Sequence, residues 1–239
     1  MSAIMVASAK GGVGKSSLCV GLGRILAEHG HTTLLVDMDI GVRSLDLLLN
    51  VAERTVYNWG DVLLNNCDPL KALIGIAPNL ALLPAPIQSS DEYNAEAMKK
   101  LIDYYKDKFE FIILDSPAGI EACFKLSLKA SDKCIIVSTP DPISIRAAGN
   151  AASLVRKGGI NDIRLVLNRF NKKQHKNICV DDVVDSVTAR FLGIVPESTD
   201  IALTAIGEEL PYDSKGNMAY LRISKRLLGE NIPFRIKNI

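Results

Sequence analysis

The sequence predicts a doubly wound α/β fold, in which helices cover both faces of a mostly parallel sheet. Short β-branched runs recur along the chain: "IMVAS", "TTLLVD", "LALLPA", "FEFIILD", "KCIIVST", "IRLVLN" and "LGIVPE". They are apolar on both faces, as buried parallel strands are. Longer helical patterns alternate with them, which is the arrangement that a doubly wound sheet requires.

Apolar residues at three- and four-residue spacing predict helices at 16–28, 91–105, 143–156, 180–191 and 217–228. Gly30, Gly158 and Gly229 fall just past three of these helices, where a glycine C-cap is common. No repeat, low-complexity tract or long linker interrupts the pattern. We therefore expect a single domain over residues 1–239.

Composition excludes several classes of protein. Hydrophobic residues make up 48% and charged residues 23% of the 239 residues, and the net charge of +1 shows no general bias toward nucleic acid. The five cysteines form no C-x-x-C or C-x-C pair, so neither a zinc site nor a shared metal cluster is expected. The N-terminus lacks a signal-peptide pattern, and we expect a cytoplasmic protein.

The stretch "SAKGGVGKSS", residues 8–17, predicts a phosphate-binding loop between a strand and a helix. Its backbone N–H groups would meet phosphate at a helix N-terminus. Lys15 should reach the β- and γ-phosphates, and the Ser16 hydroxyl should bind Mg²⁺. The predicted cofactor-binding residues here are Gly11, Gly12, Val13, Gly14, Lys15, Ser16 and Ser17.

Two residues depart from the usual loop pattern. Ala9 replaces a glycine, which is tolerable if its φ is negative. Lys10 lies too far along the rim to duplicate Lys15, so we expect its ammonium to point outward, toward a phosphate held by another molecule.

The octamer "KGGVGKSS" resembles the deviant Walker A signature of the MinD/ParA ATPases. In that family the early lysine crosses the dimer interface and touches the partner's nucleotide. The resemblance therefore implies an ATP-dependent homodimer in which Lys10 acts in trans.

The stretch "LLVDMDIGVRSLDLLL", residues 34–49, is a buried strand that ends in Asp37 and Asp39. The two side chains alternate, so one can face Mg²⁺ while the other faces the γ-phosphate. "DMDIGVRSLD" resembles the MinD-like branch of the family. The resemblance implies that Asp39 orients the attacking water and that Asp37 belongs to the metal shell.

The stretch "FIILDSPAGI" fits a Walker B strand, in which Asp115 holds Mg²⁺, followed by a switch at 117–119 that ends in Gly119. For the base, Asn168 follows a late strand, where parallel sheets bind ligands. The resemblance makes Asn168 the adenine-reading amide and Pro196 with Glu197 a second base-contacting loop. All three positions fit strand-end turns equally well.

Together these residues predict Mg²⁺-dependent hydrolysis of ATP to ADP, with Lys10, Lys15 and Asp39 as catalytic residues. The resemblance extends from Ile4 to about Phe234. It implies selection of the division septum, MinC-like and MinE-like partners, and peripheral contact with the inner face of the cell membrane.

Two departures leave parts of this open. Only "RIKNI" follows Phe234, too few residues for an amphipathic membrane helix, so either a tail is missing from this chain or the protein is a soluble relative. Arg146 precedes Ala147, where the MinD-like branch has an acidic residue near its partner-binding surface.

Two alternatives remain. A ParA-type DNA-partition ATPase needs a basic face, for which "NKKQHK" and the pair Lys225 and Arg226 are modest candidates, so nucleic-acid binding is not expected. A soluble MinD-like regulator of flagellar number or other polar machinery would share the same nucleotide site.

Overall fold

The computed structural model describes residues 1–119, 122–172, 178–204 and 210–234. The strands in these residues form one sheet. They are β1 (Ser2–Ala7), β2 (Thr33–Asp37), β3 (Ile74–Ala77), β4 (Leu80–Leu83), β5 (Phe111–Asp115), β6 (Lys133–Ser138), β7 (Asp162–Phe170) and β8 (Arg190–Pro196). Their order is β3-β4-β2-β5-β1-β6-β7-β8. All neighbours are parallel except β3 and β4. The predicted doubly wound fold is confirmed.

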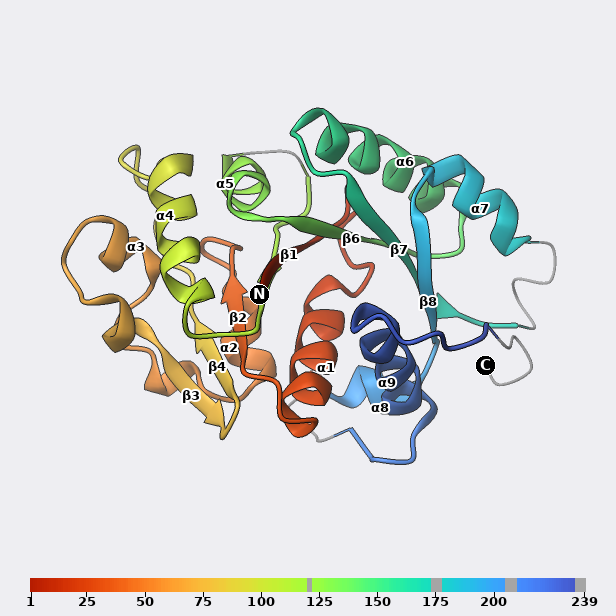
Figure 1. Cartoon of the computed structure of the whole chain (residues 1–239), viewed down its shortest axis with the longest axis horizontal. Coiled ribbons are helices and arrows are strands. Elements are labelled where there is room, and N and C mark those ends of the chain that lie inside the picture. The colour runs from red at the N-terminus through yellow and green to blue at the C-terminus, as the bar shows by residue number, and fades with distance from the viewer. Residues whose placement is uncertain (120–121, 173–177, 205–209, 235–239) are drawn as a thin grey trace.

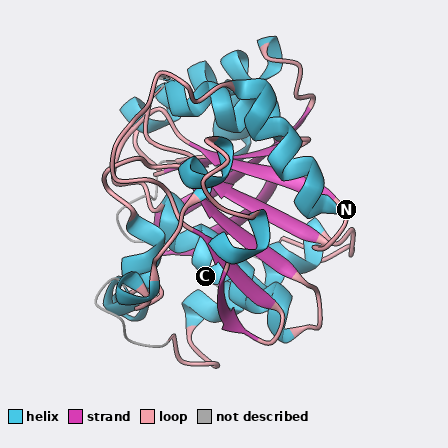
Figure 2. Cartoon of the chain, turned by 90° about the vertical axis from the view of Figure 1, so that its left-hand side faces the viewer, coloured by secondary structure: helices cyan, strands magenta, loops and turns pink. Residues whose placement is uncertain are grey.

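Helices cover both faces of the sheet, which runs as a layer between them (Figures 1 and 2). One face carries α1 (Lys15–Glu28), α2 (Ser44–Leu48), α8 (Thr199–Leu203) and α9 (Lys215–Leu227). The other carries α3 (Trp59–Leu63), α4 (Ala95–Lys106), α5 (Ala122–Ala130), α6 (Pro142–Lys157) and α7 (Val180–Val187). Within the described residues, no helix is both long enough and apolar enough to cross a membrane.

The first strand shows how the sheet serves two cores. Ile4 and Val6 pack in the cluster beneath α1 and α9, whereas Met5 and Ala7 pack in the cluster beneath α6. Successive side chains of a strand point to opposite faces. A strand covered on both sides must therefore be apolar throughout, which is the pattern that predicted this fold.

Some element boundaries differ from the sequence expectation. The helix predicted at 180–191 ends at Val187, because Thr188 has a left-handed backbone with φ of 51°. The helix predicted from residue 91 begins at Ala95, where the Asn94 side chain accepts a hydrogen bond from the backbone N–H of Ala97. β3 was not predicted from the sequence because it is short and only partly buried.

The carboxyl ends of the central strands meet at one edge of the sheet. Asp37, the last residue of β2, is the direct register partner of Asp115, the last residue of β5. The neighbouring β1 continues at the same edge into the loop that leads to α1. Ligands of open α/β sheets bind outside such strand ends, so this edge is where a site is expected.

Candidate functional site

The loop between β1 and α1 has the backbone of an anion cradle. Gly12 and Gly14 have φ of 73° and 90°, a left-handed conformation that glycine adopts readily. A Cβ at Gly14 would lie 2.1 Å from Nδ2 of Asn168, so a larger residue does not fit. Gly14 caps α1 without any side-chain hydrogen bond, which leaves first-turn N–H groups available to phosphate oxygens. Ala9 has no positive φ, so its replacement of a glycine is unstrained.

Lys15 points into this cradle rather than toward solvent. Lys15 is only 9% exposed, and its ammonium donates a hydrogen bond to Ser8 Oγ at 3.1 Å. Ser8 Oγ in turn donates to the backbone carbonyl of Lys10 at 2.6 Å. The predicted phosphate-binding lysine is thus held by the loop itself, where it can meet the β- and γ-phosphates.

Ser16, Ser44 and Asp115 form a cluster of oxygens beside the cradle. Ser16 Oγ lies 3.1 Å from Ser44 Oγ, and Ser44 Oγ donates to Asp115 Oδ2 at 3.5 Å. Asp115 is 2% exposed, and its Oδ1 has no hydrogen-bond partner among the described residues. Burial raises the pKa of Asp115 to about 6. Carboxylate and hydroxyl oxygens suit Mg²⁺, and a cation would favour the ionised carboxylate, so these residues fit a magnesium ion.

Ser44 was not predicted from the sequence. It is the first residue of α2, and only the fold brings that helix end beside Ser16 and Asp115. Its place in "GVRSLD", after a strand-end aspartate pair, was a weak signal for a serine at a helix start.

Asp37 holds the segment that follows it. Its Oδ1 accepts a hydrogen bond from the backbone N–H of Asp39, and its Oδ2 accepts one from the backbone N–H of Leu45, both at 2.9 Å. Burial and then the neighbouring charge of Asp115 raise the pKa of Asp37 to about 7. Asp37 therefore ties both ends of the 39–45 segment to β2. Its place in the metal shell stays a prediction.

Asp39 is free to act on a ligand. It is half-buried, and within the described residues its carboxylate accepts no hydrogen bond. Burial raises the pKa of Asp39, and the charge of Lys15 opposes that rise.

Gly119, on the far side of the loop, has φ of 97° and donates its N–H to Ser8 O at 3.4 Å. The structure thus brings both Asp39 and Gly119 to the cradle.

Lys10 does not point into the cradle with Lys15. Its side chain is 44% exposed, and its ammonium pairs with Oδ2 of Asp141 at 3.4 Å. Although burial acts to raise it, hydrogen bonds from Thr139, Ser144 and Lys10 hold the pKa of Asp141 below its usual range. Asp141 was not predicted as a site residue from the sequence; in "TPDP" it has the position of a helix N-cap, and it does cap α6.

Asn168 supports the cradle from below. Its Nδ2 donates to Val13 O at 2.7 Å, and its Oδ1 accepts the N–H of Arg169 at 2.9 Å. Only 4% of the residue is exposed. These contacts give Asn168 a structural role, and reading of adenine stays a prediction.

The second predicted base loop lies at the ends of β7 and β8. Pro196 is the register partner of Phe170, and Glu197 donates its N–H to Phe170 O at 3.0 Å. Glu197 Oε2 accepts a hydrogen bond from Asn171 at 3.2 Å. The two residues thus lie at the same edge of the sheet as the cradle, and their contact with a base is untested.

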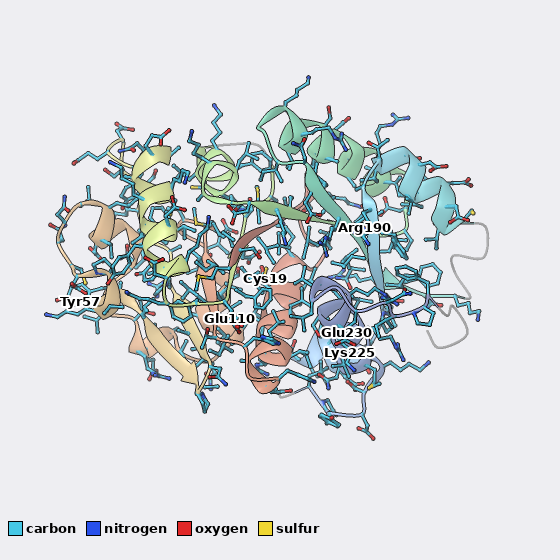
Figure 3. The ribbon with its side chains drawn as sticks, viewed as in Figure 1. Cys19, Tyr57, Glu110, Arg190, Lys225 and Glu230 are labelled. Carbon is cyan, nitrogen blue, oxygen red and sulfur yellow. The ribbon has the colours of Figure 1, made fainter. Side chains whose placement is uncertain are left out.

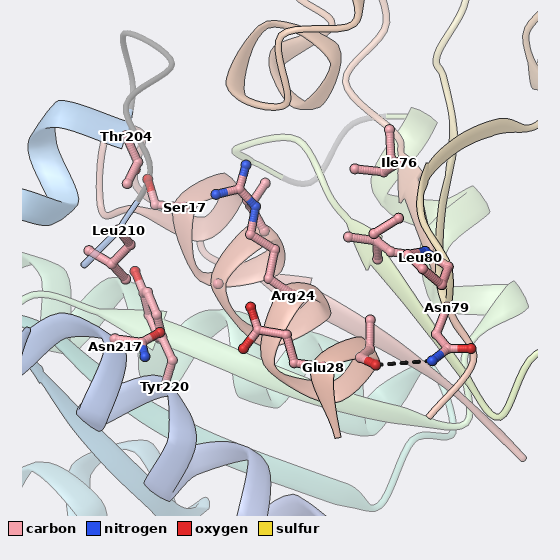
Figure 4. A pocket seen from close by; sticks show the side chains of 15 residues that line it. Ser17, Arg24, Glu28, Ile76, Asn79, Leu80, Thr204, Leu210, Asn217 and Tyr220 are labelled. Atoms are coloured by element: carbon pink, nitrogen blue, oxygen red, sulfur yellow. Dashed lines mark hydrogen bonds between the residues drawn. The ribbon is translucent and has the colours of Figure 1, made fainter. Parts of the chain in front are cut away.

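Ser17 faces a different concavity from its neighbours in the loop. A groove of about 510 Å³ runs over the outer face of α1, between β3–β4 and α9, and Ser17 lines it together with Arg24 and Tyr220 (Figure 4). Lys15 and Ser16 do not line this groove. The prediction that Ser17 contacts the nucleotide is untested.

Comparison with known proteins gives the same family. A model of the CobQ/CobB/MinD/ParA nucleotide binding domain matches residues 4–211. The septum site-determining protein MinD of Synechocystis sp. is 40% identical over 97% of this chain and 91% of that protein. The chain belongs to the MinD/ParA family.

The MinD likeness extends to other relatives. The septum site-determining protein MinD of Bacillus subtilis is 34% identical over 98% of this chain and 91% of its own length. The solved structure of a MinC:MinD cell division protein complex from Aquifex aeolicus superposes with a TM-score of 0.90, at 33% identity and 98% coverage of both chains. This chain is therefore a MinD-like P-loop ATPase with a nucleotide binding domain.

Proposed function

We propose that this MinD-like ATPase is a switch that is monomeric with ADP and forms a homodimer with ATP. The observation that carries the proposal is the outward position of Lys10. Its side chain is 44% exposed and paired with Asp141 at the rim, whereas Lys15 enters the cradle of its own chain. A lysine so placed can reach a nucleotide held by a second copy.

Catalysis in this site rests on positioning and charge. The backbone N–H groups at the start of α1 and the Lys15 ammonium bind the phosphates. Ser16 and Asp115 would hold Mg²⁺, which when bound neutralises charge on the phosphoryl oxygens. Asp39, whose carboxylate is free of hydrogen bonds within the described chain, orients the attacking water.

The partner copy completes the charge balance. Lys10 of the second chain adds a cation near the transferred phosphoryl group only when two ATP-bound chains meet. Nucleotide state would thereby set oligomeric state, since hydrolysis removes the phosphate that Lys10 contacts.

The cellular role proposed is placement of the division septum, with a MinC-like protein as one partner. The Aquifex aeolicus relative is described as a MinC:MinD complex, which supports a partner of this class. A MinE-like regulator and reversible contact with the inner membrane face are proposed from the same likeness. Residues 235–239, the stretch "RIKNI" that follows Phe234, lie outside the described residues.

The DNA-partition alternative finds little support. Arg226, one of its candidate cations, donates hydrogen bonds to the carbonyls of Leu192 and Ile232 and stacks on Phe234, so it is engaged within the fold. Lys225 precedes it on α9 (Figure 3). Most of "NKKQHK" falls at 173–177, outside the described residues.

Light scattering on a sizing column tests the switch. Wild type should be monomeric with ADP and dimeric with ATP. Asp39→Ala should stay dimeric with ATP because the water is not positioned, and Lys10→Ala should stay monomeric. Four monomeric samples, or a Lys10→Ala dimer as stable as wild type, would refute the trans role of Lys10.

A further inference from the structure

Trp59 connects a neighbouring helix to the end of β2. It is the chain's single tryptophan, the first residue of α3, and it is fully buried. Its indole Nε1–H donates a hydrogen bond to the backbone carbonyl of Asp37 at 2.8 Å. The indole therefore holds the main chain at the residue that precedes Met38 and Asp39.

Asp37 passes this constraint to the 39–45 segment. Its carboxylate binds the backbone N–H groups of Asp39 and Leu45, while its carbonyl is bound by Trp59. The main chain and the side chain of Asp37 are thus held from two directions. A change at the indole would shift Asp37 and, through a 2.9 Å hydrogen bond, the backbone of Asp39.

The indole itself is rigidly placed. The backbone N–H of Trp59 donates a hydrogen bond to Pro84 O at 3.1 Å. The indole ring packs edge-on against the Tyr93 ring, with the ring centroids 5.0 Å apart. Asn58, just before it, forms a capping box with Asp61 at the start of α3. A donor fixed by packing and by a helix cap is what precise positioning of a reactive group requires.

We propose that Trp59 is a positioning residue for ATP hydrolysis, acting through Asp37 to hold Asp39 where it orients the attacking water. The inference rests on the proposed role of Asp39. Among the described residues, Trp59 makes no hydrogen bond to the phosphate cradle or to Ser16 and Asp115. Its loss should consequently affect the chemical step rather than nucleotide binding.

The experiment removes the indole N–H and leaves the shape of the side chain. Because the chain has one tryptophan, growth with β-(3-benzothienyl)alanine in a tryptophan auxotroph replaces Trp59 alone, with sulfur in place of the N–H. Trp59→Phe provides a second, genetically encoded test. Steady-state ATP hydrolysis gives kcat and KM for each protein.

Tyr105→Phe is the matched control. Tyr105 is also fully buried, lies in the same core cluster, and donates one hydrogen bond to a carbonyl, that of Pro69, at 2.6 Å. Both changes remove one buried donor, but only Trp59 is bonded to Asp37. If each lost hydrogen bond only stabilises the fold, the changes at Trp59 and Tyr105 should lower the melting temperature equally.

We expect kcat to fall at least about fivefold in both Trp59 proteins, the scale of one net hydrogen bond, with KM for ATP changed less than about twofold. Tyr105→Phe should keep its kcat within about twofold. A wild-type kcat in the analogue protein, or an equal fall in Tyr105→Phe, would overturn the positioning role. Full activity in Asp39→Ala would instead refute the role of Asp39 itself.

Discussion

Lys10 and Asp141 form an ion pair across the rim of the phosphate-binding loop, although 131 positions separate them in the sequence. The pair holds in its own chain the lysine that we propose to act in a second chain. Asp141 also accepts hydrogen bonds from Thr139 Oγ1 at 2.7 Å and from the N–H of Ser144 at 2.9 Å, so the carboxylate has a fixed position. Dimerisation would have to exchange this contact for one with a phosphate.

Asp141→Asn should therefore strengthen the ATP-bound dimer. The asparagine still caps α6 but no longer attracts Lys10 by charge. An exposed ion pair contributes about 0–1 kcal/mol, so the dimer dissociation constant should fall by up to about fivefold. Sedimentation at several protein concentrations with ATP measures it.

The control for this change is Asp103→Asn, which removes ion pairs with Lys99 and Lys106 on α4, away from the loop. It should leave the dissociation constant unchanged. Weaker dimers in Asp141→Asn would show that Asp141 supports the interface rather than competing with it.

Asp115→Asn should change how stability depends on pH in the metal-free protein. The pKa of Asp115 is raised to about 6 by burial. Because this exceeds the value in an unfolded chain, about 4, the carboxyl favours folding at low pH, and that contribution is lost as pH rises through about 6. Asparagine does not titrate, so the decline in melting temperature between pH 5 and pH 8 should be smaller in the variant.

Thermal unfolding with EDTA, and then with Mg²⁺ and ADP, measures both parts of this prediction. Wild type should gain more from Mg²⁺ than Asp115→Asn does, because the variant lacks the carboxylate that fits the ion. Equal gains from Mg²⁺ in the two proteins would argue against Asp115 as a metal ligand.

Asn168→Ala separates support of the loop from reading of the base. The side-chain amide of Asn168 donates a hydrogen bond to Val13 O and accepts one from the N–H of Arg169. Loss of this amide should therefore loosen the cradle for every phosphate ligand. We expect the affinities for pyrophosphate, ADP and GDP to fall by a similar factor, about fivefold or more, because the hydrogen bonds are lost. Calorimetric titration of the three ligands measures the factors.

A different result would assign Asn168 to the base. If ADP affinity fell while pyrophosphate bound as in wild type, the amide would act on adenine. Glu197→Gln serves as the comparison at the same sheet edge, because its side chain contacts Asn171 and not the cradle. It should leave pyrophosphate binding unchanged.

Much of the fold could be predicted because its signals are local. Runs such as "FEFIILD" are apolar on both faces only if helices cover both sides of the sheet, and β5 is buried in that way. The end of α7 was missed because Thr188 adopts a left-handed backbone that nothing in "DSVTAR" announces. β3 was missed because a four-residue, half-exposed strand carries little pattern.

The phosphate-binding loop could be predicted from the sequence alone, since Gly12, Gly14 and Lys15 act within a few residues of one another. The sequence also placed Asp37, Asp39 and Asp115 at strand ends, because the chain direction of parallel strands sends those ends to one edge. Three contacts depend on the folded arrangement instead: Lys10 pairs with Asp141, Ser44 joins Ser16 and Asp115, and Trp59 binds the carbonyl of Asp37. These contacts join distant segments, and their geometry follows from how helices pack on the sheet, which no local spacing of residues encodes.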